Sequence, residues 1–300
     1  MNIKIFSNFA LFLVAAIWGL SFVAQKAGMD YLGPFGFNFA RSFLGGLSLI
    51  PVIFIAKLIQ KDTRTPEIKH EQHVEMTKAG LACGFALFTA MSIQQYCMPQ
   101  ATAGRAGFIT SLYIIFVPII LSFFGKKIQK LILVSITLAL CGLYLLCCKN
   151  TASGFSIYDI LLLISAFCYA AHIVVVNFLS QKNNPVKISC FQFFVVGILS
   201  FPLMLIFENP QLSDFINCTI PILFAGVITC GIAYTLQIFG QKHTPPIAAS
   251  LIFCLESVFA VIGGCLILHE TMTLREILGC VLMISGVILS QLSGAKTTKQ

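Results

Sequence analysis

The sequence has little charge. Asp, Glu, Lys and Arg together make up 10% of its 300 residues, whereas soluble domains contain about 25%. Hydrophobic residues make up 58% of the chain, and the mean hydropathy is +0.92. A water-soluble domain of this length needs more charge, so we expect most of the apolar surface to face lipid.

The sequence also lacks the motifs of several enzyme classes. It has no HExxH zinc motif, no GxSxG nucleophile motif and no Gly-rich phosphate loop that would make ATP the direct energy source. Its twelve cysteines lie mostly inside apolar runs and form no paired CxxC motifs, so we interpret them as small apolar helix residues. The sequence therefore predicts no cofactor and no metal.

The formal net charge of +8 would suit a nucleic-acid partner, because a basic surface attracts phosphates. The Lys and Arg residues, however, lie in loops between apolar runs, a pattern that sets the orientation of membrane proteins. The expected partners are therefore the lipid bilayer and a small-molecule metabolite, and not nucleic acid. Association as a homodimer stays open.

Ten apolar runs are long enough to cross a bilayer, since a helix needs about 20 residues to span about 30 Å of hydrocarbon. They are apolar throughout, whereas the strands of a membrane barrel alternate apolar and polar residues. We therefore predict an all-α integral membrane protein with ten transmembrane helices, the first of them uncleaved. The expected spans are 7–26, 35–56, 78–97, 104–124, 131–148, 158–179, 188–207, 219–239, 246–268 and 274–292.

The positive residues favour one orientation of these spans. If the N-terminus is cytoplasmic, one of the 19 Lys and Arg residues, Arg41, lies inside a span and fourteen lie on the cytoplasmic side. The four on the outer side are Lys26, Arg105, Lys149 and Arg275. Because cytoplasmic loops are rich in Lys and Arg, we expect a multi-pass protein of the inner (plasma) membrane with both termini cytoplasmic.

The two halves of the chain resemble each other. The predicted repeats are residues 1–148 and 157–292, with a linker at 149–156 and a cytoplasmic tail at 293–300. The offset in residue number between the repeats is 151 at first, 142 after the polar loop at 57–77, and 144 near the end. We expect that polar loop to be a solvated cytoplasmic linker. The pairs are Trp18 with Tyr169, Arg41 with Gln192, Gly46 with Gly197, Pro51 with Pro202, Gln95 with Gln237, Thr102 with Thr244 and Gly142 with Gly286.

An odd number of spans in each half means that the second half starts on the opposite side of the membrane from the first. The halves are thus expected to be inverted five-helix repeats. Many secondary transporters have this architecture, because two similar halves can exchange roles and open one central site to either face in turn.

Several stretches resemble the EamA-type proteins of the drug/metabolite transporter superfamily. They are IWGLSF at 17–22, FARSF at 39–43, ATAGRAGFIT at 101–110 running on to Pro118, and AASL at 248–251 continuing through Glu256 to LHE at 268–270, followed by Gly279 and Gly286. The resemblance covers nearly the whole chain.

Membership of that family would imply ten helices with both termini inside. It would also imply a central cavity lined mainly by the first, third, fourth, sixth, eighth and ninth helices, and export or exchange of amino acids or related metabolites. The sequence departs from the family in one place. Ser257 follows the glutamate of the ninth helix where the family often has a proline, so a break or bend of that helix is in doubt.

Three ionisable residues lie inside the expected spans, where each costs about 2.5–3.5 kcal/mol to insert and is a functional candidate by default. Glu256, about 15 Å deep, could bind a substrate amine or take up a proton, or it could be a neutral acid hydrogen-bonded between helices. Arg41, roughly 9 Å deep, could bind a carboxylate or pair with an acid such as Glu256, or its stem could reach the outer headgroups. His172 could relay protons or be satisfied by a neighbour.

Aromatic residues lie at the level of the midplane. Trp18 and Tyr169 are each eleven residues into their spans and Tyr113 is nine residues into the fourth, the depth at which inverted repeats place the substrate. Their faces could stack on a substrate or hold a cation, with ordinary packing as the alternative.

Polar residues in the spans are further candidates. Gln95 and Gln237, near opposite faces, could form polar gates that alternately pair and open, or they could hold helices together. Ser21, Gln25 and Asn38 are weaker candidates of the same kind. Taken with the repeat, these residues predict a secondary transporter of small metabolites that works by alternating access through a midplane cavity. The resemblance implies that it is an exporter or exchanger of metabolites such as amino acids. A membrane-embedded enzyme and a passive channel are the alternatives.

Overall fold

The computed structural model describes residues 3–59, 65–101, 103–126, 128–147, 156–268 and 273–296. Thr102, most of the expected linker at 149–156 and the end of the expected tail at 297–300 lie outside these ranges, as do His269 and Glu270. The elements in chain order are α1 (Ile3–Gly28), α2 (Pro34–Ile59), α3 (Pro66–Cys97), η1 (Met98–Gln100), α4 (Ala103–Ser111), α5 (Tyr113–Phe123), α6 (Lys130–Cys147), α7 (Ile157–Leu179), α8 (Pro185–Phe207), α9 (Leu212–Asn217), α10 (Thr219–Leu223), η2 (Phe224–Ala233), α11 (Tyr234–Gln241), α12 (Pro246–Phe253), α13 (Glu256–Leu268) and α14 (Leu274–Lys296).

Every regular element in the described residues is helical. Eight helical runs are long and apolar enough to cross a membrane, counting Arg105–Phe123 and Thr219–Gln241 as one run each. Two further apolar runs, Lys130–Leu145 and Pro246–Ile262, are shorter, and they correspond to the expected fifth and ninth spans. By length and composition the chain is built as a multi-pass helical membrane protein.

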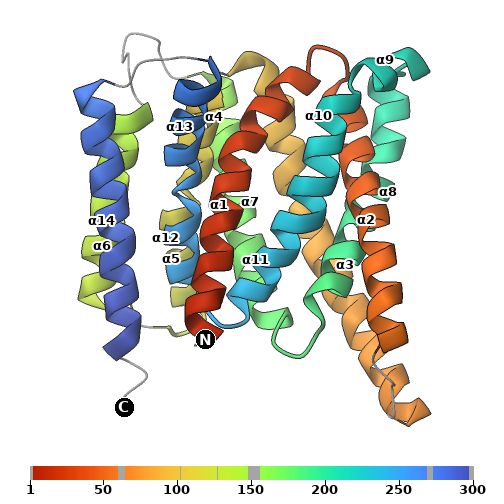
Figure 1. The fold of residues 1–300 in the computed structure, drawn as a ribbon, viewed down its shortest axis with the longest axis horizontal. Helices are drawn as coiled ribbons and strands as arrows, with labels where there is room; N and C mark the ends of the chain where they lie inside the picture. Colours follow the sequence, from red (N-terminus) through yellow and green to blue (C-terminus); the bar gives the residue numbers. More distant parts are fainter. Residues whose placement is uncertain are drawn as a thin grey trace.

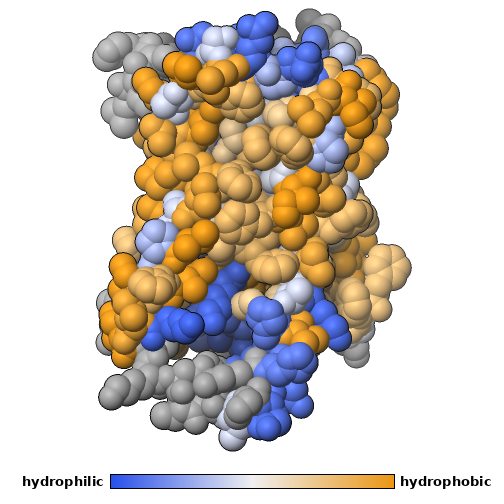
Figure 2. All heavy atoms as spheres, turned by 90° about the vertical axis from the view of Figure 1, so that its right-hand side faces the viewer, coloured by the Kyte–Doolittle hydropathy of each residue, from blue (hydrophilic) through white to orange (hydrophobic). Residues whose placement is uncertain are grey.

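Many polar side chains of the helices are buried together with an apolar core, and the outward-facing side chains are largely apolar. In α1 the buried face carries Ser21 and Gln25, while Phe9, Phe12 and Leu13 point outward and are 40% to 62% exposed. Figure 2 shows the same arrangement on one face of the molecule, where a broad hydrophobic band separates two hydrophilic ends. This distribution suits a lipid environment, because exposed apolar side chains face hydrocarbon instead of water.

The helices pack in a few principal pairs. The α6/α14 pair lies at one edge of the bundle and the α2/α8 pair at the other, with α1 and α7 between them (Figure 1). α3 packs against both α7 and α8, and α1 packs against η2, α11 and α13. α1 begins and α14 ends at the same end of the bundle (Figure 1).

Two expected spans are broken in the middle. The span at 104–124 is divided at Leu112 into α4 and α5, and the span at 246–268 is divided at Cys254 and Leu255 into α12 and α13. The doubt raised by Ser257 was therefore wrong, since the ninth-span helix breaks without a proline. Contacts with other helices at the break take the place of the missing proline. In one of them, Gly19 of α1 lies so close that a Cβ there would be 2.5 Å from the carbonyl oxygen of Glu256.

The expected polar linker at 57–77 is also largely helical. α2 continues to Ile59 and α3 begins at Pro66, so the described part of this segment extends the two helices beyond the apolar spans. The side chains at Lys57, Glu67 and Glu71 are exposed. The polar residues are thus compatible with solvent, but most of them form helix and not an irregular linker.

Candidate functional site

A cavity lies at the centre of the bundle, where the broken helices meet α1, α2, α3, α7 and η2. The empty space between its lining side chains is about 440 Å³, a volume that includes space open to its surroundings. The lining residues are Trp18, Ser21, Phe22, Gln25, Arg41, Met91, Gln94, Thr110, Tyr113, Tyr169, Thr229, Cys230, Tyr234 and Glu256.

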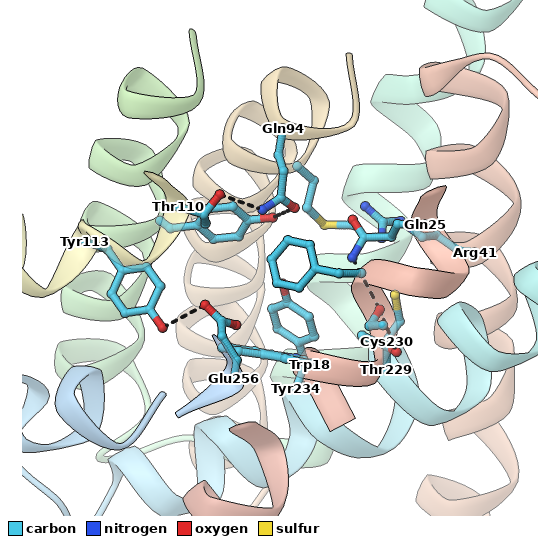
Figure 3. A pocket seen from close by; sticks show the side chains of 14 residues that line it. Trp18, Gln25, Arg41, Gln94, Thr110, Tyr113, Thr229, Cys230, Tyr234 and Glu256 are labelled. Atoms are coloured by element: carbon cyan, nitrogen blue, oxygen red, sulfur yellow. Dashed lines mark hydrogen bonds between the residues drawn. The ribbon is translucent and has the colours of Figure 1, made fainter. Parts of the chain in front are cut away.

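Glu256 enters the cavity from the break before α13. The residue is 3% exposed, and its Oε1 atom accepts hydrogen bonds from Ser111 Oγ at 3.0 Å and from Tyr113 OH at 3.1 Å. Both donors lie beside the other break, between α4 and α5, and Figure 3 shows the bond from Tyr113. Two hydroxyl donors on one oxygen support an acceptor role for the carboxyl group, and they leave Oε2 for a ligand.

Arg41 enters the cavity from α2 and is 2% exposed. Its Nε and Nη2 atoms donate to Asn38 Oδ1 at 3.0 and 2.7 Å, and the guanidinium carbon lies 5.3 Å from the centre of the Phe37 ring. Among the described residues, no carboxylate lies within ion-pair distance of Arg41. A buried guanidinium has five N–H donors, so a neutral amide leaves it able to bind an anion.

Aromatic side chains form the wall between these charges. In Figure 3, Glu256 and Arg41 lie at opposite sides of the cavity, with Trp18 and Tyr234 between them. The centre of the Trp18 ring lies 4.9 Å from that of Tyr234 and 5.1 Å from that of Phe253. Trp18 Nε1 is buried and has no hydrogen-bond partner among the described residues, so the cavity offers an unused donor as well as an apolar wall.

Gln94 connects three helices at the cavity. Its Oε1 accepts from Tyr169 OH at 2.9 Å, and its Nε2 donates to Thr110 Oγ1 at 3.1 Å. These bonds join α3 to α7 and to α4. Gln94 therefore fixes the direction of the Tyr169 ring.

The π-helix η2 supplies Thr229 and Cys230. Thr229 Oγ1 donates to Ser21 Oγ at 3.1 Å, joining η2 to α1. η2 also packs tightly on α2, where a Cβ at Gly45 would lie 2.5 Å from Cys230 Cβ. π-helical turns are rare in proteins overall, and those that occur are often at functional sites. This one directs Thr229 and Cys230 toward the cavity.

The structure brings six of the nine predicted site residues to this cavity: Trp18, Ser21, Arg41, Tyr113, Tyr169 and Glu256. The other three, Gln95, His172 and Gln237, are fully buried outside its lining. His172 Nε2 lies 3.2 Å from Gln192 Oε1, and its ring centre is 6.1 Å from that of Tyr234.

The two glutamine repeat partners have similar surroundings. Gln95 Nε2 donates to the Gln25 carbonyl at 3.2 Å, and Gln237 Nε2 donates to Gln241 Oε1 at 2.9 Å. The Oε1 atom of each is buried without a partner. Each therefore has an unsatisfied acceptor, which water would satisfy if the adjacent helices separated.

Sequence reasoning missed several lining residues, chiefly Gln94, Thr229 and Tyr234. Gln94 had a signal, because it adjoins the predicted Gln95, but one residue along a helix turns a side chain by about 100°. Thr229 lies in the π-helix and Tyr234 directly follows it, and the π-helix departs from the regular α-helical period. No sequence signal pointed to that departure.

The sequence matches known proteins over nearly its whole length. The EamA-like transporter family matches twice, at residues 5–148 and 156–292. An uncharacterized transporter of Archaeoglobus fulgidus is 30% identical over 290 residues, covering 96% of this chain and 87% of its own. The uncharacterized transporter YoaV of Bacillus subtilis is 21% identical, covering 92% and 94%.

More distant similarities agree with these. A chloroplastic WAT1-related protein of Arabidopsis thaliana is 23% identical over 287 residues, covering 91% of this chain and 66% of its own. A solved crystal structure superposes with a TM-score of 0.73 at 15% identity and covers 98% of both chains, which shows the shared fold alone. The family match extends across both halves of the chain, and the protein is a multi-pass membrane protein that belongs to the EamA-like transporter family.

Proposed function

We propose that the protein is a secondary transporter of small zwitterionic metabolites such as amino acids, which works by alternating access through the central cavity. The observation that carries this proposal is the pairing of opposite charges across the cavity. Arg41 has N–H donors for a carboxylate, and Glu256 has an oxygen for an ammonium group. The aromatic wall between them suits an apolar side chain.

Alternating access requires two halves that can exchange roles, and we propose that the ten expected crossings form inverted five-helix repeats. The α2/α8 interface supports this. Phe194 of α8 lies against Gly46 of α2, and Phe43 of α2 lies against Gly197 of α8. The two phenylalanine rings meet at 5.5 Å. The offset that pairs Gly46 with Gly197 also pairs Phe43 with Phe194. Interchanging the two helices therefore turns each glycine–phenylalanine contact into the other, as a two-fold axis between the helices requires.

The α6/α14 pair gives similar support at the other edge. A Cβ at Gly142 would lie 2.5 Å from the Gly279 carbonyl oxygen, and a Cβ at Gly286 would lie 2.7 Å from the Ser135 carbonyl oxygen. Gly142 and Gly286 are repeat partners, and each permits the close approach of the other helix. The same axis would therefore relate both edges of the bundle.

We further propose that both termini are cytoplasmic and that the membrane is the inner (plasma) membrane. The distribution of Lys and Arg supports this orientation. Transport is driven by a gradient, as a proton-coupled or substrate-exchange process through Glu256. In the proposed export direction, the substrate enters the cavity from the end where α1 begins.

Ligand binding tests the charge pairing directly. L-phenylalanine should raise the unfolding temperature of the purified protein, because a ligand that binds the folded state stabilises it. 2-Phenylethylamine lacks the carboxylate and 3-phenylpropionate lacks the amine, so each should stabilise it less. Arg41→Gln should remove the preference for phenylalanine over the amine. Equal stabilisation by all three compounds would refute the zwitterion site.

Transport in proteoliposomes tests the coupling. Exchange of labelled phenylalanine should lose its pH dependence in Glu256→Gln, since the amide cannot bind and release a proton. Glu71→Gln, which changes an exposed carboxyl group of α3, is the matched control. Full pH-dependent flux in Glu256→Gln would refute the proton role.

A further inference from the structure

The helices around the cavity are joined at both ends of the bundle. At the end where α4 and α7 begin, Arg105 Nε donates to Asp159 Oδ1 at 2.7 Å and Arg105 Nη2 donates to Asp159 Oδ2 at 2.6 Å. Asp159 is 2% exposed, and its Oδ2 also accepts from the backbone N–H of Ser156. A bidentate ion pair therefore holds α4 against α7.

The corresponding contact at the opposite end is neutral. The offset that pairs Trp18 with Tyr169 places Asn8 on Asp159. Asn8 Oδ1 accepts from Thr244 Oγ1 at 3.0 Å, and Asn8 Nδ2 donates to Gln291 Oε1 at 2.8 Å. Thr244 lies two residues before α12 and Arg105 lies in the first turn of α4, and the offset that pairs Gln95 with Gln237 places Thr244 on Thr102, three residues before Arg105. Amide and hydroxyl groups therefore hold α1 near the start of α12, whereas charges hold α7 against the start of α4.

A second pair of contacts repeats this difference. Lys26 Nζ, near the end of α1, donates to the carbonyl oxygens of Met98, Pro99 and Ala101 at 2.8, 3.1 and 3.2 Å. The offset that places Asn8 on Asp159 also places Lys26 on Asn177. Asn177 Nδ2 donates to the Gln241 carbonyl at 3.2 Å, and the later offset, which pairs Gln95 with Gln237, places Pro99 on Gln241. A charged donor thus fastens one end, and a neutral amide fastens the other.

We name the Arg105–Asp159 and Lys26 contacts the charged contacts, and the Asn8–Thr244 and Asn177–Gln241 contacts the neutral contacts. Hydrogen bonds with an ionised group are shorter and roughly twice as strong as neutral ones. Opening the cavity to one side requires the helices at that end to separate. The end with the charged contacts is therefore harder to open.

We propose that these repeat-related contacts are the two gates of the carrier, and that the empty protein rests closed at the charged contacts and opens more often at the neutral contacts. The inference rests on the proposed alternating access. In the proposed orientation the neutral contacts face the cytoplasm, so the empty site is loaded from inside the cell. Asp159 and Lys26 stand at the positions that the offset pairs with Asn8 and Asn177, and this exchange of charged for neutral side chains gives a direction to an otherwise symmetric device.

Cys230 provides a native reporter of opening, because it lines the cavity and is fully buried. A membrane-impermeant maleimide is added to sealed vesicles of each orientation, and labelling of the Cys230 peptide is followed by mass spectrometry. We expect faster labelling of the unmodified protein from the face that carries Asn8. Equal rates from both faces would overturn the proposal.

The variants give each charged residue the side chain of its repeat partner. Asp159→Asn and Lys26→Asn should each raise Cys230 labelling from the face that carries Arg105 by roughly fivefold, the difference between a charge-assisted and a neutral bond. Asp214→Asn changes a half-buried carboxyl group of α9 at the same end (Figure 1), whose hydrogen bonds stay within residues 211–214, and it should leave labelling unchanged. Labelling of both variants at the rate of Asp214→Asn would overturn the proposal.

Asn177→Lys tests the opposite direction and covers the case in which the other variants fold poorly. It should slow Cys230 labelling from the face that carries Asn8, and an unchanged rate would count against the gate. The labelling needs no transported substrate. If the variants shift the labelling but phenylalanine is neither bound nor exchanged, the gates stand and the proposed substrate fails. If Cys230 is reached from one face only in every variant, alternating access itself fails.

Discussion

The two broken helices, α4–α5 and α12–α13, have the same backbone pattern but different side chains. At the first break the N–H of Leu112 donates to the Ile109 carbonyl at 3.2 Å, and at the second the N–H of Leu255 donates to the Ile252 carbonyl at 3.1 Å. Each bond joins a residue to the third residue before it, so each helix tightens where it breaks. One offset in residue number pairs Ile109 with Ile252 and Leu112 with Leu255.

The side chains that follow the breaks have complementary roles. The offset that pairs Leu112 with Leu255 places Tyr113 on Glu256, and Tyr113 OH donates to Glu256 Oε1. One break therefore supplies the hydroxyl donor and the other supplies the acceptor. The two positions that the offset pairs therefore bind each other, and Glu256 is the one carboxyl group among the described residues that line the cavity. The same kind of difference, charged against neutral, distinguishes the contacts at the two ends of the bundle.

The largest effect is expected from making the two breaks alike. Tyr113→Glu places a second carboxyl group against Glu256 in a buried site, where like charges repel. Tyr113→Gln is the control for size without charge. At pH 8 we expect the free energy of unfolding of the Glu variant to be about 3 kcal/mol lower than that of the Gln variant, as measured by thermal unfolding in detergent. Adding Glu256→Gln should restore most of the difference, and no restoration would show that the two positions do not face each other.

The second prediction concerns the approach of α1 to the break before α13. A Cβ at Gly19 would lie 2.5 Å from the Glu256 carbonyl oxygen and 2.9 Å from the Ala260 backbone nitrogen. Since backbone atoms cannot rotate away, Gly19→Ala should cost about 1–3 kcal/mol of unfolding free energy. Gly107 of α4 has its nearest neighbour, Phe22, at an ordinary 3.6 Å, so Gly107→Ala should cost little. Equal losses would mean that α1 does not brace the second break.

The third prediction separates the two donors of the first break. Ser111→Ala and Tyr113→Phe each remove one hydroxyl group from Glu256 Oε1, and each should cost about 0.5–1.5 kcal/mol. The double variant should differ from the sum of the single variants, because both hydroxyl groups bond the same oxygen. Thermal unfolding of the four proteins gives the coupling. Strict additivity would indicate that the two donors act independently.

The sequence predicted the class of fold because apolar run length and charge distribution are local properties. It could not predict the breaks in the same way. The break before α13 has no proline and is maintained by Gly19, Ser111 and the residues around them, which are distant in sequence. The helical parts of the 57–77 segment were not predicted, because its polar composition is compatible with both a solvated helix and a solvated loop.

The site was predicted in part for a similar reason. Depth along a span identified Trp18, Tyr169 and Glu256, since depth follows from counting residues. Gln95 was selected because the offset pairs it with Gln237, and neither that pairing nor depth gives a direction around the helix axis, so its neighbour Gln94 was missed. Depth was also compatible with two interpretations of Arg41, a buried side chain and one that reaches the outer headgroups. Only the packing of α2 places that side chain in the cavity.

The smallest effect is expected where this chain departs from its family. Because α13 begins at Glu256, a proline at position 257 falls in its first turn, where proline is tolerated. Ser257→Pro would lose the bond from its N–H to the Cys254 carbonyl and the 3.3 Å contact with Ser111 Oγ, so we expect a loss of about 1 kcal/mol or less. Val261→Pro, in the interior of α13, should cost about 3 kcal/mol more than Val261→Ala. A similar cost at both positions, measured by thermal unfolding, would mean that the helix runs unbroken through Glu256, and the equivalence of the two breaks would then be lost.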